Sequence, residues 1–417
     1  MTPPAGAARL LASPFSSGWA SHLDRIGPRP RGSAATIAEV ERSGIRGRGG
    51  AAFPTAVKLA SVAGRRAPVV VANGTEGEPL SSKDKTLLVS APHLVLDGAA
   101  IAAEAVGAAT VLVCVARGAT TALAAVRAAL AERESVGADT VALRLEETPD
   151  RYLVGEETAL IQWLNGGDAK PTTVPPRPFE RGVGGRPTVV QNVETLAHVA
   201  LVARFGAAWF RQMGTVSDPG TRLLTISGGV SRPGVYEVPS GFPVRGALDA
   251  AGLPPGAPPA VLAGGYFGTW LSPDEVDGTR LEVESMRAAG SSPGCGVLWV
   301  LPPHACGLVE SARVSRWYAD QNAGQCGPCV NGLPAIAEAF GALVSGTRVA
   351  QAVDCLKRWS HMVSGRGACR HPDGAARFVT SALRVFGFEI DRHARMGPCA
   401  ACRTAALLPV PAAGRWR

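Results

Sequence analysis

The 417-residue chain has 46% hydrophobic residues and a formal net charge of +8. That length and apolar content can bury more than one core, so we expect a globular protein of two or three domains. Its 50 glycines and 33 prolines follow no period, which excludes a collagen-like repeat. No basic helix is interleaved with aromatic residues, so the positive charge favours an acidic protein partner and not nucleic acid.

The sequence carries no signal for direct membrane insertion. Its most apolar region, residues 94–116, is interrupted by Asp97 and Glu104, and the N-terminus lacks a charged start followed by an apolar run. Residues 1–30 show little periodicity, so we expect a tail or a loosely packed helix there. Nine cysteines in a reducing compartment favour metal ligands or free thiols over disulfides. We therefore expect a cytoplasmic protein.

Strand and helix patterns alternate through the first part of the chain. The β-branched run 67–72 predicts a buried strand, and further strands are expected at 110–116 and 140–145. Helical patterns cover residues 94–105 and 120–134. This alternation predicts an α/β sheet, with ligands gathered at the carboxyl ends of its strands.

A basic, glycine-rich segment, S-G-I-R-G-R-G-G-A-A-F-P-T-A-V-K, runs from Ser43 to Lys58. Its glycines permit close approach of the backbone to a ligand, and its cations suit an anion; the residues are Gly44, Gly47, Gly49, Gly50, Arg46, Arg48 and Lys58. The spacing matches neither common glycine-loop motif. A surface turn needs only one or two glycines. The segment therefore predicts a loop around a nucleotide-like phosphate.

Two further segments place carboxylates where a ligand is expected. Glu76 and Glu78 follow the first predicted strand in N-G-T-E-G-E-P-L-S-S-K-D-K, although a solvated acidic turn would also carry them. The segment Y-L-V-G-E-E-T-A-L-I-Q-W-L begins at Tyr152 as a strand-like run and becomes an amphipathic helix at Glu156. Glu156 and Glu157 then occupy its first turn, where capping alone could explain them.

The last third of the chain combines helical patterns with cysteine pairs. Helices are expected at 309–319, 332–343, 349–361 and 374–386. Cys326 and Cys329 form a Cys-x2-Cys pair, with Cys369 further on, which indicates zinc or an iron–sulfur cluster. Cys399 and Cys402 form a second pair, expected to bind metal or to be redox-active. For Cys114, Cys295 and Cys306 we expect ordinary apolar packing.

Together these motifs resemble the NADH-binding, FMN-carrying flavoprotein subunit of respiratory complex I and its hydrogenase and formate dehydrogenase relatives. The frame G-R-G-G-A-x-F-P-T, the segment around Glu76, the Y-x-x-G-E-E-T-A-L helix and G-V-G-G-R-P-T-V-V-Q-N-V-E-T all carry the likeness. The resemblance implies an N-terminal tail (1–30), a Rossmann-like α/β flavin domain (31–218), a small β-grasp domain of the SLBB type (219–305) and a C-terminal helical iron–sulfur domain (306–417).

The resemblance also implies roles for individual residues. Glu78 and Glu157 would lie near the ribose and nicotinamide of NADH and take part in catalysis. FMN and nucleotide contacts would come from Gly47, Arg48, Gly49, Gly50, Phe53, Lys58, Asn73, Glu76, Tyr152, Gly155, Glu156, Asn192 and Thr195. Cys326, Cys329 and Cys369 would bind a 4Fe-4S cluster.

Several positions depart from the family pattern. Thr75 replaces an aspartate and Val154 a cysteine, whereas Val174 and Arg177 replace a lysine and the aromatic that stacks on NADH. Ala323 occupies the first position of the cluster motif, and a methyl group cannot coordinate iron. The fourth ligand is then expected from Cys399 or Cys402, with Cys355, His371 or an external thiolate or water as alternatives.

The function implied is that of an electron-transfer flavoprotein. It would pass electrons from NADH through FMN to an iron–sulfur cluster or a ferredoxin-like acceptor, as a possible subunit of a larger complex. Two alternatives stay open: an FMN and iron–sulfur module that no longer uses NADH, and a non-catalytic structural subunit. The changes at Val174 and Arg177 favour flavin binding over NADH binding, and the cluster itself is either incomplete, absent or completed by another donor.

Overall fold

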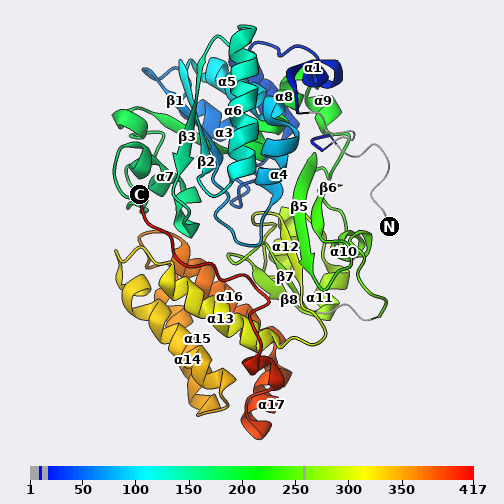
Figure 1. Ribbon diagram of the computed structural model, residues 1–417, viewed down its shortest axis with the longest axis vertical. Helices are drawn as coiled ribbons and strands as arrows, with labels where there is room; N and C mark the ends of the chain where they lie inside the picture. Colours follow the sequence, from blue (N-terminus) through cyan, green and yellow to red (C-terminus); the bar gives the residue numbers. More distant parts are fainter. Residues whose placement is uncertain (1–8, 12–16, 257–259) are drawn as a thin grey trace.

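The computed structural model describes residues 9–11, 17–256 and 260–417. An α/β region, a smaller mixed sheet and a helical region follow one another along the chain (Figure 1). This confirms the predicted fold class, a Rossmann-like α/β region followed by a small β module and a helical bundle. The last residues run from the helical region back to the α/β region, where the chain ends beside α7 (Glu157–Leu164).

The α/β region is built on a four-stranded parallel sheet. Its strands are β1 (Val69–Gly74), β2 (Thr110–Ala116), β3 (Ala142–Thr148) and β4 (Thr188–Asn192), in the order β3-β2-β1-β4. The valine-rich β1 and β2 are buried on both faces, as strands of a parallel sheet with helices around it are. β4 was not predicted as a strand, because its five residues lie inside a segment interpreted as a ligand-binding motif.

Helices surround this sheet. They are α2 (Ala34–Ser43), α3 (Thr55–Ala60), α4 (Lys83–Ser90), α5 (Pro92–Val106), α6 (Thr120–Ser135), α7, α8 (Val193–Phe205) and α9 (Ala207–Phe210). α5 and α8 approach closely because Gly98 has no side chain: a Cβ there would lie 1.8 Å from the Leu196 carbonyl oxygen. This contact fixes α8, and with it the end of β4.

The first helix, α1 (Trp19–Ile26), lies within the segment expected to be a tail or a loosely packed helix. Residues 1–8 and 12–16 of that segment lie outside the described residues. In α1 the His22 side chain is 5% exposed and its Nε2 lies 2.8 Å from Asp97 of α5. Asp97 also pairs with Arg133 at 2.8 Å. Residues 19–26 are therefore packed, because α1 supplies a partner to the carboxylate that interrupts the most apolar helix.

The second region is a five-stranded mixed sheet with the order β6-β5-β9-β7-β8. Its strands are β5 (Thr221–Gly228), β6 (Gly234–Pro239), β7 (Val261–Ala263), β8 (Thr269–Leu271) and β9 (Val297–Val300). Three short helices flank it: α10 (Val244–Ala250), α11 (Pro273–Gly278) and α12 (Val283–Ala288). One face packs on these helices in a core of its own, and the other contributes Trp270 and Trp299 to the core of the helical region.

The helical region contains α13 (Gly307–Asp320), α14 (Leu333–Val344), α15 (Val349–Val363), α16 (His371–Val385) and α17 (Gly387–Met396). A π-helical turn, Pro328–Gly332, leads into α14, and a 3-10 turn, Ala400–Arg403, follows α17. The four predicted helices correspond to α13–α16 to within a few residues. α17 was not predicted.

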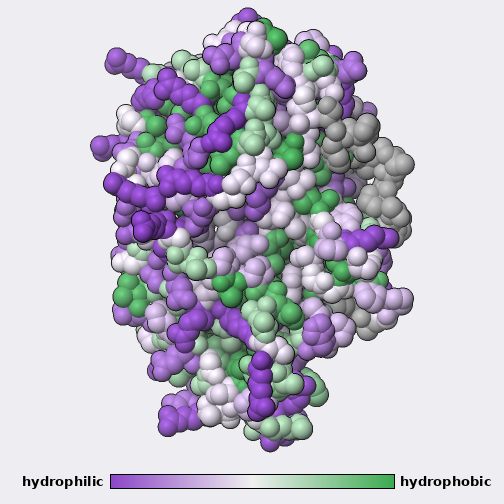
Figure 2. Space-filling model, viewed as in Figure 1, coloured by the Kyte–Doolittle hydropathy of each residue, from purple (hydrophilic) through white to green (hydrophobic). Residues whose placement is uncertain are grey.

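Within the described part of the chain, no single helix is long and apolar enough to cross a membrane; α4 and α5 meet that test only as a pair, with a 96° bend between them. On the face shown in Figure 2, hydrophilic and hydrophobic residues are intermingled.

Candidate cofactor and metal sites

The glycine loop is a closed turn between α2 and α3. The Gly47 amide donates to the Phe53 carbonyl at 2.8 Å, and the Thr55 amide donates to the Ile45 carbonyl at 3.1 Å. Gly50 has a φ of +118°, which side chains with a Cβ rarely adopt. These contacts hold the backbone amides of the loop in one arrangement, and Phe53 stays 46% exposed at its side.

Arg48 anchors this loop to the rest of the α/β region. Its amide donates to Oγ1 of Thr195 at 2.9 Å. Its guanidinium is buried, pairs with Asp218 at 3.1 Å and donates to the Pro219 carbonyl at 3.1 Å. The Arg48 guanidinium is therefore not a free cation, as the sequence suggested, but is paired inside the protein with Asp218, which it shares with Arg222.

The carboxyl ends of β1 and β4 bring two predicted contact residues side by side. Asn73 and Asn192 are paired in register on these parallel strands. The Asn73 amide nitrogen donates to the Gly155 carbonyl at 2.9 Å, so the segment before α7 is held at the same edge. Asn192 caps α8 by accepting from the Glu194 amide at 3.0 Å and donates to Asp84 at 2.7 Å. Residues from three separate motifs therefore meet at one edge of the sheet.

Glu76 is engaged in holding the start of α4. Its carboxylate accepts from the amides of Asp84 at 2.9 Å and Lys85 at 3.0 Å, and from the Ser81 hydroxyl at 2.6 Å. Its backbone has a φ of +37°, which is uncommon outside glycine. The hydrogen bonds at the N-terminus of α4 compensate for that conformation, so Glu76 shapes the loop after β1.

Glu78 points into a contact between the three regions. Its side chain accepts from the Tyr266 amide at 2.9 Å and from the Tyr152 hydroxyl at 3.4 Å, and the residue is only 8% exposed. Burial raises the pKa of the Glu78 carboxyl to about 7, against the lowering effect of those hydrogen bonds. Gly265 is required beside it, since a Cβ there would lie 2.7 Å from the carboxyl group. The Glu78 carboxyl therefore gains or loses its proton close to neutral pH.

The segment from Tyr152 is a 3-10 helix, Tyr152–Gly155, and not the strand-like run that the sequence predicted. The Asn73 contact pulls Gly155 toward the sheet edge, and the chain turns at once into α7. Glu156 caps that helix, since its carboxylate accepts from the amides of Thr158 and Ala159, both at 3.0 Å. Capping, one of the two interpretations offered for Glu156, is thus present in the structure.

Lys58 and Glu157 come together from two motifs. Lys58, at the end of the glycine segment, lies 2.9 Å from the Glu157 carboxylate, and both side chains are 32% exposed. Lys58 also donates to the Val190 carbonyl of β4 at 3.3 Å. A cation and a carboxylate are thus presented to solvent at the sheet edge, next to the glycine loop.

Two buried polar atoms near this edge have no partner within the described protein. The Gln191 amide nitrogen sits one residue before Asn192, and the Thr55 hydroxyl sits at the base of the glycine loop. Burying an unpaired polar group costs about 1–3 kcal/mol, so such atoms point to a ligand or to water. Sequence reasoning missed both. Together with the glycine loop and the Lys58–Glu157 pair, they fit a polar, phosphate-bearing group such as FMN.

Cys326, Cys329 and Cys369 gather at one end of the helical region. Cys326 and Cys329 lie in the turn before α14, whereas Cys369 precedes α16, which packs against that turn. The pKa of Cys369 is raised to about 11 and that of Cys329 is raised further, in both cases mainly by burial. The thiols of Cys329 and Cys369 are therefore protonated until a metal displaces the proton.

Ala323 is buried at the position where a first ligand is expected. Two residues beyond Cys369, His371 is 1% exposed and its Nε2 lies 3.0 Å from the Tyr318 carbonyl, to which it donates. The other ring nitrogen, Nδ1, is buried without a partner among the described residues. Burial also lowers the pKa of His371 to about 4, so its ring is neutral. Nδ1 of His371 is thus a buried nitrogen with a free lone pair, two residues beyond Cys369.

Cys399 and Cys402 do not belong to that group, which contradicts the expectation that one of them supplies the missing ligand. Cys399 lies within 4.8 Å of Cys306, immediately before α13, whereas Ala323 and Cys326 follow the other end of α13. A 14-residue helix is about 21 Å long. The loop length allowed recruitment, but α13 separates the two groups.

Comparisons with known families match most of these regions. Residues 40–201 match the Nuo51 FMN-binding domain, residues 223–264 the SLBB domain, and residues 310–393 the NADH-ubiquinone oxidoreductase-F iron-sulfur binding region. These three matches lie in the α/β region, the small sheet and the helical region, respectively.

Individual relatives extend the likeness over most of the chain. An F subunit of the NADH-quinone oxidoreductase of Rhizobium meliloti (strain 1021), numbered F 2, is 32% identical over 339 residues, which are 78% of this chain and 80% of that protein. The F subunit of the Mycobacterium bovis enzyme is 33% identical over 79% of this chain and 76% of that protein. A crystal structure of NAD+-reducing NiFe hydrogenase in its H2-reduced state has a TM-score of 0.80 and 30% identity, covering 86% of this chain and 62% of the hydrogenase chain.

Proposed function

Because the chain belongs to the family of the F subunits of NADH-quinone oxidoreductase, we propose that it oxidises NADH with FMN bound at the edge of the parallel sheet. The observation that carries this proposal is the convergence of the glycine loop, the Asn73–Asn192 pair and the Lys58–Glu157 pair at the carboxyl ends of β1 and β4. Ligands of open α/β sheets bind at this edge.

One set of residues would contact FMN directly. The amides of Gly47, Gly49 and Gly50 would approach its phosphate, with Lys58 as the cation that neutralises it. Gln191 and Thr55 would supply hydrogen bonds from their unpaired atoms. FMN, when bound, supplies the ability to take up two electrons and release them singly.

A second set of residues holds the first set in place. We call the glycine loop and the adjoining carboxyl ends of β1 and β4 the cofactor cradle. Its shape is fixed by residues that cap helices, hold strand ends or form ion pairs: Asn73, Glu76, Glu156, Asn192, Thr195 and Arg48. Gly155, and with it the turn that begins at Tyr152, is held at the same sheet edge by Asn73.

NADH would enter beside the exposed Phe53 and Glu157. Phe53 offers an aromatic face to a base, and Glu157 lies where it can contact the ribose or nicotinamide. Glu78, by contrast, is buried and accepts a hydrogen bond from the Tyr152 hydroxyl, so its role is to position that tyrosine. We therefore assign the nucleotide contact to Glu157 and a positioning role to Glu78.

Electrons would leave through a cluster bound by Cys326, Cys329 and Cys369, with Nδ1 of His371 as the fourth donor. The argument for His371 is its fixed tautomer: Nε2 donates to the Tyr318 carbonyl, so Nδ1 carries a free lone pair. Replacing His371 with leucine would then change the electron paramagnetic resonance signal of the reduced cluster. An unchanged signal would remove His371 from the ligand set.

The partner would be a ferredoxin-like or other iron–sulfur protein within a larger assembly, in the cytoplasm. All nine cysteines are free thiols, which a reducing compartment preserves. The relatives named above are subunits of NADH-quinone oxidoreductase. The positive net charge suits an acidic electron carrier.

One observation favours a second candidate, an FMN and iron–sulfur module that takes electrons from a protein in place of NADH. Val174 and Arg177 occupy positions where the family has a lysine and an aromatic, and both are exposed. The nucleotide would therefore lose two of its usual contacts.

Anaerobic mixing with NADH separates these two candidates. Bleaching of the flavin absorbance within the dead time of mixing or within seconds supports NADH oxidation. A yellow protein that NADH does not bleach, but reduced ferredoxin does, supports the second candidate. A colourless protein that neither retains nor takes up added FMN would leave only a structural role.

A further inference from the structure

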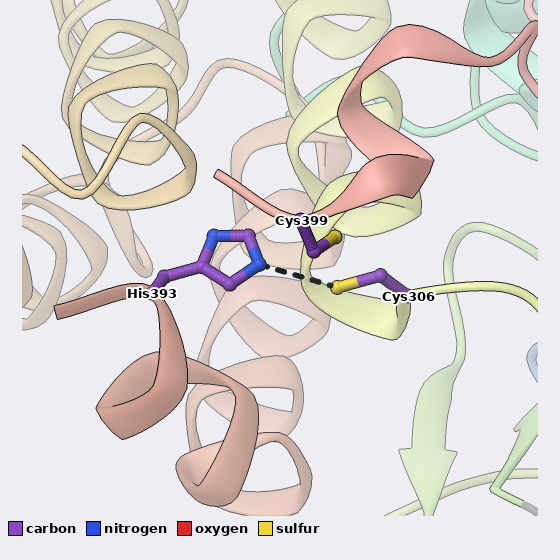
Figure 3. A group of neighbouring side chains, drawn as sticks. All are labelled: Cys306, His393 and Cys399. Carbon is purple, nitrogen blue, oxygen red and sulfur yellow. Dashed lines mark hydrogen bonds between the residues drawn. The ribbon is translucent and has the colours of Figure 1, made fainter. Parts of the chain in front are cut away.

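A second group of metal-ligand side chains lies at the other end of α13. Cys306 immediately precedes α13, His393 lies on α17, and Cys399 lies in the segment after it. Figure 3 shows the three side chains pointing toward one another. Their ligand atoms all lie within 4.8 Å of one another, and Cys306 Sγ is 3.8 Å from His393 Nε2. No other such group of three is present among the described residues.

The His393 ring is set in the orientation of a metal ligand. The residue is fully buried, and Nδ1 lies 2.7 Å from the Val344 carbonyl, to which it donates. Nδ1 must then carry the proton, so the lone pair of Nε2 faces the two sulfurs. A ligating histidine usually has a carbonyl or carboxylate on its second nitrogen in just this way.

Cys402 lies beside this group, outside the 4.8 Å that joins its three members, and is its nearest candidate for a fourth ligand. The 3-10 turn Ala400–Arg403 brings Cys402 Sγ to 4.0 Å from Cys399 Sγ. Arg313 of α13 donates to the Ala401 carbonyl at 3.3 Å and to the Ala405 carbonyl at 3.0 Å, which holds this turn against the helix and places a positive charge near the thiols. Two thiols and one imidazole thus meet from three separate segments, with the Cys402 thiol next to Cys399.

The spacing suits one tetrahedral ion. With Zn–S bonds of about 2.3 Å and Zn–N bonds of about 2.0 Å, tetrahedral geometry puts two sulfurs about 3.8 Å apart and a sulfur and a nitrogen about 3.5 Å apart. The observed separations are 4.0 Å and 3.8 Å. A disulfide would require sulfurs about 2.05 Å apart. Ordinary apolar packing, which the sequence predicted for Cys306, does not account for a thiol whose hydrogen-bond partner is the Nε2 of a buried histidine.

We propose that Cys306, His393, Cys399 and Cys402 bind one Zn²⁺ ion in a structural site, separate from the iron–sulfur cluster. Four protein ligands leave no open position for substrate or water, so the ion would stabilise structure and not react. It would join the start of α13, the end of α17 and the turn after it, in addition to the hydrogen bonds that Arg313 makes to that turn.

The segment that this ion would fix reaches the cofactor cradle. Beyond Cys402, the amide of Leu408 donates to Glu310 at 2.9 Å, and the Pro409 carbonyl accepts from the Tyr266 hydroxyl at 2.6 Å. Further on, the Gly414 carbonyl accepts from Arg151, the neighbour of Tyr152. Figure 1 shows this last segment running from the helical region to the α/β region. Zinc would therefore anchor one end of a strap that spans both.

Metal analysis of the full chain tests the site. Protein purified without chelators should hold about one zinc per chain in addition to its iron. Cys306→Ser and His393→Gln should each lose that zinc, while FMN and iron contents stay at the wild-type level. The matched controls are Cys355→Ser and His361→Gln on α15, which should keep zinc. Wild-type zinc content in Cys306→Ser, or zinc loss in the controls as well, would overturn the assignment.

A second measurement needs no substitution and so does not depend on how the variants fold. The wild-type protein is stripped of zinc with a chelator and titrated with Co²⁺ alone. The expected result is the intense visible absorption of tetrahedral Co²⁺ with thiolate ligands, at one equivalent, abolished by one equivalent of Zn²⁺. Absence of both zinc in the purified protein and a thiolate–Co²⁺ spectrum would refute the proposal, as would iron in place of zinc. NADH oxidation is not a readout here, so a failed NADH test leaves this result intact.

Discussion

The cofactor cradle at the sheet edge and the cysteine groups of the helical region use their polar residues differently. In the cradle, Asn192, Glu76 and Glu156 cap helices or close loops within the protein. In the helical region the thiols are free, and His371 and His393 each direct one nitrogen away from their carbonyl partners. Cradle residues therefore fold the protein as well as bind, whereas the metal ligands have little structural duty until metal arrives.

This difference has a consequence for mutations. A substitution in the cradle should lower both stability and cofactor content, because the same hydrogen bonds serve both. A substitution at a metal ligand should remove the metal and leave the flavin in place. The following experiments test that separation.

The largest effect is expected from Cys329→Ser. Cys329 is buried within the Cys-x2-Cys turn, so no neighbouring side chain can replace it without moving the backbone. Iron and sulfide should fall to background, with FMN content unchanged, by elemental analysis and absorbance of anaerobic protein. Cys355→Ser, on α15, should retain its iron. Loss of FMN together with iron in Cys329→Ser would break the proposed separation.

In the cradle, Gly50→Val should reduce FMN affinity by roughly tenfold or more. Valine is strained by about 1–3 kcal/mol at the φ of +118° found here, and the loop must shift to relieve it. The measurement is FMN bound per chain after gel filtration. Gly137→Val is the matched control: its φ of +60° imposes similar strain, a Cβ there meets nothing within 4 Å, and it follows α6 at the opposite edge of the sheet. Equal FMN loss in both variants would point to general destabilisation.

Glu78 predicts a pH dependence of stability. Its pKa rises from 4.5 to about 7 on folding, so between those values the folded state binds more protons than the unfolded state. Stability should therefore fall as pH rises through this window, by about 3 kcal/mol in total. Glu78→Gln mimics the protonated group and should remove this decline, as followed by urea unfolding at about pH 5 and pH 8.

The exposed carboxylate of Glu134 provides the control for that measurement. Glu134→Gln should leave the stability difference between the two pH values as it is in the wild type. If Glu78→Gln shows the wild-type decline as well, the Glu78 carboxyl is not the group that titrates.

The sequence predicted the cradle better than the metal ligands, for a physical reason. Each cradle motif is contiguous, since a strand end, its loop and the next helix start lie within about 15 residues, so apolar runs and glycines locate it. The zinc ligands are scattered: Cys306 and His393 are 87 residues apart, and only the packing of α13 against α17 brings them together. No spacing rule signals such a pair, and an isolated cysteine is more often packed than ligating.

Misplacements within the cradle have the same origin. Arg48 was expected to face a ligand because it is cationic and lies among glycines, but Asp218, 170 residues away, takes its charge. Glu78 was expected at the nucleotide because it lies two residues from Glu76, yet Tyr266 of the small sheet covers it. The local sequence shows which side chains are charged or polar. Partners far away in the sequence determine whether such a side chain faces a ligand or is paired inside the protein.

The smallest effect, and the sharpest test of the comparison, is expected at Arg177. Arg177 is exposed, and its guanidinium makes no hydrogen bond to the described residues; only its backbone is engaged, with Glu180 and Arg181. An aromatic there would stack on a nucleotide base, which is worth about 0.5–1.5 kcal/mol. We expect wild-type kcat/KM for NADH below about 10⁴ M⁻¹s⁻¹. Arg177→Phe should raise kcat/KM for NADH up to about tenfold and leave the melting temperature unchanged. The gain for NADPH should be smaller, because the variant lacks the guanidinium that could pair with the extra phosphate of NADPH. Arg181→Phe, exposed four residues away, serves as the control. A shared gain in both variants would reflect added hydrophobic surface, and a melting temperature that falls only in Arg177→Phe would show that even the rim of the cradle contributes to folding.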